Sequence, residues 1–156
     1  MKIFRTLLGA ALALAAFGFA APLAAAQNPG VMATVNHFVD AFNRGDAKGA
    51  ASTCASPASI IDDFPPHQWQ GPNACANWFA AYNVMAKKAG ITDGVVTLER
   101  PWHVDVTGAR AYVVAPANYT YRVHGKATSL NGSVFTLVLS KLDAGWRITG
   151  WAWADH

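Results

Sequence analysis

The segment AYVVAPANYTYRVH, residues 111–124, decides the fold, because apolar or aromatic side chains recur in it at every second position. Residues two apart lie on the same face of a strand, so residues 113, 115, 117, 119, 121 and 123 would share one buried face. Similar alternation flanks this segment at residues 102–107, 133–141 and 146–154, with glycine-containing turns between them. The C-terminal half therefore predicts long antiparallel strands joined by tight turns.

The N-terminal half has a helical period instead. One stripe of a first helix would be formed by Val31, Val35, Phe38, Val39 and Phe42. Asp46 is expected to cap a short second helix that reaches about residue 54, and a third helix should start at Gly71 and Pro72 and stop at Gly90. Short extended pieces at residues 59–64 and 67–70 lie between the last two helices. Helices first and strands last predict an α+β fold, with three N-terminal helices packed on a strongly curved antiparallel sheet.

Two prolines interrupt the predicted strands, Pro101 and Pro116. Proline within a strand indicates an edge, a bulge or a strong bend. A bent sheet that wraps a helix leaves a conical hollow, and we expect a small ligand to bind there. The prediction of ligand binding depends on this hollow being open rather than filled.

Composition and charge exclude several classes of protein. The chain has 156 residues, of which 53% are hydrophobic and 13% are charged, so it should fold. Its net charge is +3, but Lys2 and Arg5 lie in an expected leader, and their removal from the 12 basic residues leaves 10 against 9 acidic ones. The basic residues are scattered, which argues against a nucleic-acid partner.

Residues 1–26 have the order of a secretory signal peptide. A charged start is followed by an apolar run and then by three alanines, residues 24–26. An anchoring helix needs about 20 apolar residues, and Pro22 interrupts the run before that length is reached. We therefore predict cleavage to a single domain, residues 27–156, which would be periplasmic or secreted from a bacterium and would have no membrane contact after cleavage.

The predicted compartment bears on the two cysteines, Cys54 and Cys75. An even pair in an oxidising compartment favours a disulfide, and two independently buried thiols are the alternative. The five histidines have no close metal-ligand spacing; they are His37, His67, His103, His124 and His156. No metal and no cofactor are predicted.

Three segments resemble one known family: VDAFNRGD at residues 39–46, ASIIDD at residues 58–63 and GWRI at residues 145–148. The order of elements around them is similar to the NTF2-like superfamily, and within it to the SnoaL-like proteins, which include polyketide cyclases, ketosteroid isomerases and many members of unknown activity. The resemblance covers residues 31–154. It implies a cone-shaped α+β fold and a possible homodimer through the sheet.

The resemblance to the isomerases is partial. It places Asp62 at the carboxylate that moves a proton beside a carbonyl. The tyrosine that donates to the oxyanion in those enzymes corresponds to Phe38 here, and no acid is found around Phe135 and Thr136, where a second donor would lie. Ketosteroid isomerisation itself is therefore not expected, because an oxyanion hole typically contributes a few kcal/mol.

Asp62 is the main catalytic candidate, with His103 as a second. Asp62 and Asp63 are adjacent, so on a strand one would face the hollow and the other solvent. Burial of Asp62 among aromatic rings would raise its pKa and make it a usable general base. Alternatively, one of the pair accepts hydrogen bonds from the proline-rich turn. His103 and Asp105 could form an orienting pair, or could be the polar side of a half-exposed strand.

Aromatic residues would form the ligand-binding wall: Phe38, Trp69, Tyr119, Tyr121, Trp151 and Trp153. Packing against a helix or a partner subunit is the alternative role for these rings. The favoured interpretation is an exported domain that holds a small apolar or aromatic molecule without assured catalysis. The alternative is a cofactor-free proton-transfer enzyme of isomerase, cyclase or hydratase type, with Asp62 as general base and His103 or a pocket tyrosine assisting.

Overall fold

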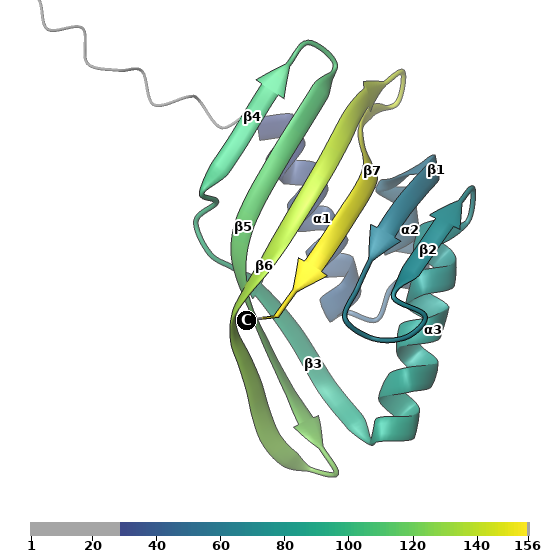
Figure 1. Cartoon of the computed structure of the whole chain (residues 1–156), viewed down its shortest axis with the longest axis vertical. Coiled ribbons are helices and arrows are strands. Elements are labelled where there is room, and N and C mark those ends of the chain that lie inside the picture. The colour runs from purple at the N-terminus through teal and green to yellow at the C-terminus, as the bar shows by residue number, and fades with distance from the viewer. Residues whose placement is uncertain (1–28, 156) are drawn as a thin grey trace, which may run out of the picture.

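The computed structural model describes residues 29–155, and the predicted signal peptide lies outside them. Within this range the chain forms three helices and one seven-stranded sheet (Figure 1). The elements are α1 (Pro29–Asn43), α2 (Ala47–Ser52), β1 (Cys54–Ile61), β2 (Gln68–Gly71), α3 (Ala74–Ala89), β3 (Ile91–Leu98), β4 (His103–Thr107), β5 (Arg110–Val123), β6 (Lys126–Leu142) and β7 (Gly145–Ala154). The predicted α+β class is confirmed.

The strand order is β2-β1-β7-β6-β5-β3, and β4 also pairs with β5. All neighbours are antiparallel except β1 and β7, which run parallel. The sheet is therefore mixed, which corrects the expectation of a purely antiparallel one. A parallel pair needs a long connection, and here α3 and five strands supply it.

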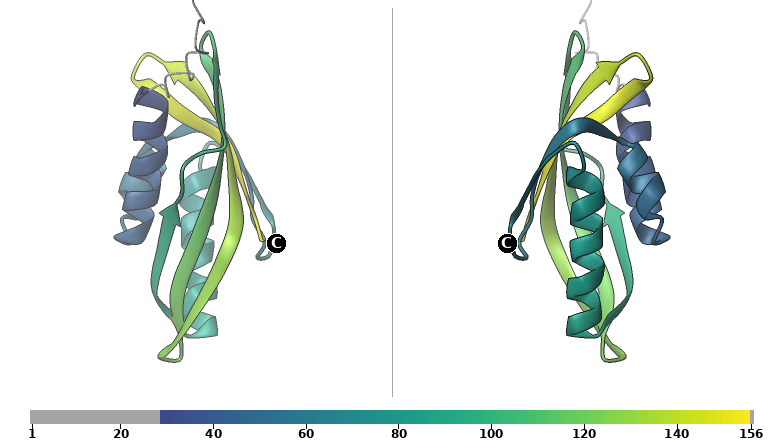
Figure 2. Two further views of the ribbon diagram at one scale, coloured as in Figure 1. Left: turned by 90° about the vertical axis from the view of Figure 1, so that its left-hand side faces the viewer. Right: turned by 90° about the vertical axis from the view of Figure 1, so that its right-hand side faces the viewer.

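The helices cover one face of this sheet (Figure 2). The predicted stripe of α1 is found on its inner side, with Val31 and Val35 fully buried. The Asp46 side chain caps α2 by accepting a hydrogen bond from the Gly49 amide at 2.8 Å, and Gly90 ends α3 in the left-handed conformation. The third helix begins two residues later than predicted, after Pro72.

The long β5–β6 hairpin contains the bend that the prolines suggested. The register shifts between Ala117 and Tyr119, where Asn118 faces two residues of β6, Asn131 and Gly132. The Asn118 side chain accepts a hydrogen bond from the Gly132 amide at 3.2 Å, and Gly132 has a positive φ of 81°. Residues 110–114 of β5 pair with β4, and residues 117–123, around and beyond the bulge, pair with β3, so the sheet has two differently directed halves.

Asn43, the last residue of α1, ties that helix to the edge strand β3. Its amide nitrogen donates to the Val96 carbonyl and its amide oxygen accepts from the Val96 amide, both at 2.8 Å. The side chain thus satisfies both backbone groups of one residue, as a neighbouring strand would. This pair of bonds fixes the distance between the helix layer and the bent half of the sheet.

Two local predictions differ from the structure. Strand β1 starts at Cys54 rather than at residue 59 and ends at Ile61, so Asp62 and Asp63 lie beyond it. The alternation at residues 102–107 predicts a strand that starts at Trp102, but this residue precedes β4 and its side chain is 61% exposed. Pro101 cannot donate a ladder hydrogen bond, and regular pairing of β4 begins only at His103.

The predicted disulfide is confirmed. Cys54 and Cys75 are bonded, with their Cα atoms 6.5 Å apart and a sequence separation of 21. The bond joins the start of β1 to the first turn of α3. Asp62 lies at the other end of β1, so the disulfide helps to hold the strand that carries it against α3.

We expect the double substitution Cys54→Ser/Cys75→Ser to lower the free energy of unfolding by about 3 kcal/mol, because the unfolded chain regains the freedom of a closed loop of about 20 residues. Urea unfolding of the variant and of the oxidised protein measures the difference. Oxidised protein treated with reductant is the control and should match the variant. Equal midpoints for oxidised protein and variant would show that the bond contributes nothing.

Candidate functional site

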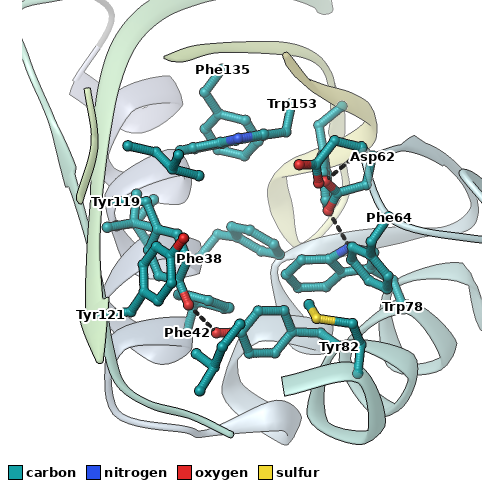
Figure 3. A pocket seen from close by; sticks show the side chains of 17 residues that line it. Phe38, Phe42, Asp62, Phe64, Trp78, Tyr82, Tyr119, Tyr121, Phe135 and Trp153 are labelled. Carbon is teal, nitrogen blue, oxygen red and sulfur yellow. Dashed lines mark hydrogen bonds between the residues drawn. The ribbon is translucent and has the colours of Figure 1, made fainter. Parts of the chain in front are cut away.

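The predicted hollow is present between the helices and the bent sheet (Figure 3). This cavity has a volume of about 220 Å³. Its lining residues come from helices, strands and the loop after β1: Phe38, Val39, Phe42, Asp62, Asp63, Phe64, Trp78, Tyr82, Met85, Ile91, Val96, Tyr119, Tyr121, Leu130, Phe135, Trp151 and Trp153.

Strand alternation and one further bulge place the aromatic walls. Tyr119 and Tyr121 continue the inward face of β5 beyond the bulge, as predicted. In β7 the register shifts between Ile148, which pairs with Leu139, and Gly150, which pairs with Val138. The extra residue, Thr149, lets Ile148 fill the core while Trp151 and Trp153 still point inward.

The walls are interlocked rings. Trp78 of α3 meets Trp151 edge to face, with ring centroids 4.8 Å apart and planes at 88°. The ring centroid of Phe38 on α1 lies 6.0 Å from that of Trp78 and 5.9 Å from that of Trp151. Such contacts hold one another in place, so the cavity is preformed. Within residues 29–155, the buried Trp151 indole N–H has no hydrogen-bond partner.

Asp62 is the ionisable group set deepest in this apolar lining, with only 8% of its surface exposed. Its Oδ2 accepts a hydrogen bond from the Trp78 indole at 2.6 Å, and its Oδ1 accepts one from the Asp63 amide at 2.8 Å. Burial raises the pKa of Asp62 to about 7, a side-chain hydrogen bond with Asp63 adds to the rise, and the Trp78 donor opposes it. Near neutral pH both the acid and the base form of Asp62 are populated.

Asp63 also borders the cavity, but it is exposed to solvent whereas Asp62 is buried, so the two adjacent carboxyls differ in burial as expected. Strand alternation is not the cause of this difference, because β1 ends at Ile61. Partial burial raises the pKa of Asp63 as well, and Asp155 raises it further. Asp155 itself accepts hydrogen bonds from Ser133 and from the Trp153 indole, both at 2.8 Å. Asp63 therefore interacts with a carboxyl on either side, that of Asp62 in the cavity and that of Asp155 beyond its lining.

Tyrosine hydroxyls lie across the cavity from Asp62 (Figure 3). The hydroxyls of Tyr82 and Tyr119 are hydrogen-bonded to each other, and Tyr121 stacks on Tyr119 with centroids 4.7 Å apart. Burial raises the pKa of both Tyr82 and Tyr119, so both stay protonated as donors. Gly94 leaves room for them, since a Cβ there would lie 2.6 Å from the Tyr119 hydroxyl.

Most of the predicted site residues meet at the cavity. Its lining includes Asp62 and five of the six predicted wall residues, Phe38, Tyr119, Tyr121, Trp151 and Trp153. Trp69 is buried against Phe64 at 5.0 Å, outside the lining. His103 is exposed on β4, so the structure does not bring it to Asp62.

Sequence reasoning missed Tyr82 as a functional residue, because it falls on the stripe of α3 that indicates core packing. The only signal was its spacing of four residues from Trp78, which places both on one side of the helix. Among residues 29–155 there is no cluster of three or more potential metal ligands, and none of the helices has the length and apolar character needed to cross a membrane.

A family model described as the SnoaL-like domain matches residues 31–152. The chain belongs to the SnoaL-like domain family. This confirms the predicted resemblance to the SnoaL-like proteins, and the match includes part or all of every described element from α1 to β7. Members of the family need not share a reaction, so the match establishes the fold and leaves the chemistry to the site.

Solved structures agree with this assignment. An NTF2-like protein with a cystatin-like fold from Novosphingobium aromaticivorans is 16% identical, with 83% of this chain and 81% of that one covered and a TM-score of 0.68. A ketosteroid isomerase-like protein from Erwinia carotovora is also 16% identical, with 84% and 97% covered and a TM-score of 0.67. A domain of unknown function from Nostoc punctiforme is 22% identical, with 85% and 78% covered and a TM-score of 0.64.

These identities support a shared NTF2-like fold and nothing finer. A search of curated proteins gives no match to the chain. The predicted homodimer is not tested by these comparisons and stays a prediction.

The raised pKa of Asp62 has a consequence for stability. Between pH 4 and pH 7 the folded protein holds a proton on Asp62 that the unfolded chain has released, so stability falls as pH rises, by up to about 1.4 kcal/mol per pH unit. We expect Asp62→Asn to make this decline shallower in urea unfolding across the range. Some decline of stability with pH should remain in this variant, because the pKa of Asp63 is also raised and Asp63 is unchanged.

Asp40→Asn, at an exposed position on α1, is the matched control and should retain the wild-type slope. If Asp62→Asn also retained that slope, the Asp62 carboxyl would titrate alike in the folded and unfolded chain, and the proposed burial would be wrong.

Proposed function

We propose that the protein binds a small ring compound in the cavity and that Asp62 transfers a proton to or from it. The supporting observation is a carboxyl group enclosed by aromatic walls whose pKa is raised to about 7. A general base works best when its pKa is near the working pH, because it is then both available and strong enough.

The cavity sets the size of the ligand. A protein cavity of about 150 Å³ with apolar walls is known to accept benzene, so about 220 Å³ suits one ring with substituents or two small fused rings. The flat faces of Phe38, Trp151 and Trp153 favour a planar apolar ligand. Few polar groups line the cavity, so those few would determine its orientation.

The polar groups of the cavity, the Asp62 carboxyl and the tyrosine hydroxyls, could together remove a proton from the carbon atom next to a ligand carbonyl group. Ionised Asp62 would take the proton from carbon, and the electron pair of that C–H bond would form a C=C bond while charge develops on the carbonyl oxygen. A tyrosine hydroxyl from the opposite wall would donate a hydrogen bond to this oxygen. Protonated Asp62 would then return the proton to the same or another carbon, which gives exchange or isomerisation without a cofactor.

Two tyrosine donors are available for this role. The described residues provide no hydrogen-bond partner for the Tyr121 hydroxyl. The hydrogen bond between Tyr82 and Tyr119 uses the proton of one hydroxyl, so the other hydroxyl can still donate its proton to a ligand. They would replace the donor that is absent at Phe38. His103 has no part in this scheme.

Ligand binding without catalysis is the second candidate. It is favoured by the hydrogen bonds that both Asp62 oxygens already accept, because these donors lower the basicity of the carboxylate. In this case the cavity would hold or carry the ligand, and Asp62 would help to orient it.

An exported location fits either function. The Cys54–Cys75 disulfide is typical of proteins in oxidising compartments, and the predicted signal peptide would deliver the domain to the periplasm or outside the cell.

Proton exchange on β-tetralone, a two-ring ketone with acidic C–H bonds, separates the two candidates. In D2O near pH 7 the wild-type protein should speed loss of the adjacent C–H signals in NMR spectra, and Asp62→Asn should lose a factor of about 100 or more. Tyr119→Phe should show a smaller loss. Asp40→Asn should exchange like wild type. If wild type and Asp62→Asn were equally slow while the ketone still bound, the cavity would be a binding site only.

A further inference from the structure

The charged side chains that line the cavity are all acidic. Its lining includes the carboxyls of Asp62 and Asp63, with Asp155 beside the latter, and no lysine, arginine or histidine is among the lining residues. The Nδ1 of His67 lies 3.2 Å from the backbone carbonyl oxygen of Asp62, and in the described part of the chain His67 makes no hydrogen bond or ion pair with the Asp62 carboxyl. The acidic wall therefore has no cationic partner within the lining.

This asymmetry discriminates between ligands by charge. An anionic ligand would be removed from water and placed beside carboxyls without a counter-charge, which is strongly unfavourable. A neutral ligand would leave the acidic wall as it is. A cationic ligand would supply the missing partner of Asp62, so burial would favour the pair once the ligand is bound.

The remaining lining also suits a cation. Ten of the seventeen lining residues are phenylalanine, tyrosine or tryptophan. The face of each ring carries partial negative charge and attracts a positive group within about 6 Å of its centre. Phe64, Trp78 and Trp153 lie around Asp62 (Figure 3). The bond from the Trp78 indole fixes the carboxyl relative to this group of rings.

We propose that the natural ligand is a small amine bound in its protonated form, with the ammonium group between Asp62 and the surrounding rings and an apolar ring system filling the rest of the cavity. This inference rests on the ligand-binding part of the proposed function, because it uses the same cavity and the same carboxyl, and it narrows the bound ring compound to one chemical class.

Binding of such a ligand requires ionised Asp62. Because burial raises the pKa of Asp62 to about 7, affinity for an ammonium should rise between pH 6 and pH 8, with release of a proton on binding. Partial burial also raises the pKa of Asp63, and its ionisation acts in the same direction, whereas Tyr82 and Tyr119 stay neutral. A neutral ligand should show no such rise.

The test compares three probes with one ring and different charge: benzylamine, benzyl alcohol and benzoate. Calorimetric titration at pH 8 should give an affinity for benzylamine about tenfold above that for benzyl alcohol, with benzoate the weakest. At pH 6 the preference for the amine should shrink. Asp62→Asn should remove about tenfold from benzylamine affinity and leave benzyl alcohol affinity nearly unchanged, while Asp40→Asn should behave as wild type.

Equal affinity for benzylamine and benzyl alcohol, or a benzylamine affinity that Asp62→Asn leaves unchanged, would overturn the amine proposal. In either case, binding and exchange of β-tetralone would show that the proposed function still stands. If none of the four compounds bound, the cavity would not be a ligand site and both proposals would fail.

Discussion

The bend in the β5–β6 hairpin is the constraint on which the site depends. A sheet of this length, packed flat on α1 and α3, would have its inner face filled by helix side chains, as most cores are. The bulge at Asn118 turns the second half of the hairpin away, and Asn43 then fixes that half at a set distance from α1 through two bonds to Val96. The space between them cannot close without breaking these bonds.

Burial of Asp62 follows from the same arrangement. The disulfide holds the beginning of β1 against α3, and the indole of Trp78 on α3 donates to the carboxyl at the end of the same strand. Apolar surroundings without a cationic partner destabilise the ionised form of this carboxyl. A leucine at the same position would pack better than the aspartate does. Such local conflicts between stability and chemistry are expected where a protein binds or transforms a ligand.

Sequence reasoning could predict features that depend on local periodicity. The alternation in β5 placed Tyr119 and Tyr121 inside because the extra residue of the bulge lies on β6 and leaves the period of β5 intact. The pair Trp151 and Trp153 was found for the same reason, since both follow the bulge in β7. The candidate role of Asp62 was inferred from the family resemblance, and its burial was expected only if its side chain faced the hollow.

Features that depend on distant contacts were not accessible from the sequence. Whether Asp63 faces the cavity depends on where β1 stops, which its pairing with β2 and β7 decides. The same holds for the parallel alignment of β1 with β7. His103 could act as an acid or base, but it lies on β4, away from the cavity. Tyr82 resembles an ordinary core residue in the sequence, and only its contact with Tyr119 reveals its place in the site.

The titration of the Asp62 carboxyl tests the central claim most directly. Carbon NMR of protein labelled at aspartate carboxyls, with Asp62→Asn to assign the signal, reports its protonation as pH changes. The account predicts a midpoint near 7, well above an ordinary aspartate. A midpoint near 4 would mean that water or a cation reaches this carboxyl freely, and the enclosed acidic cavity would not exist.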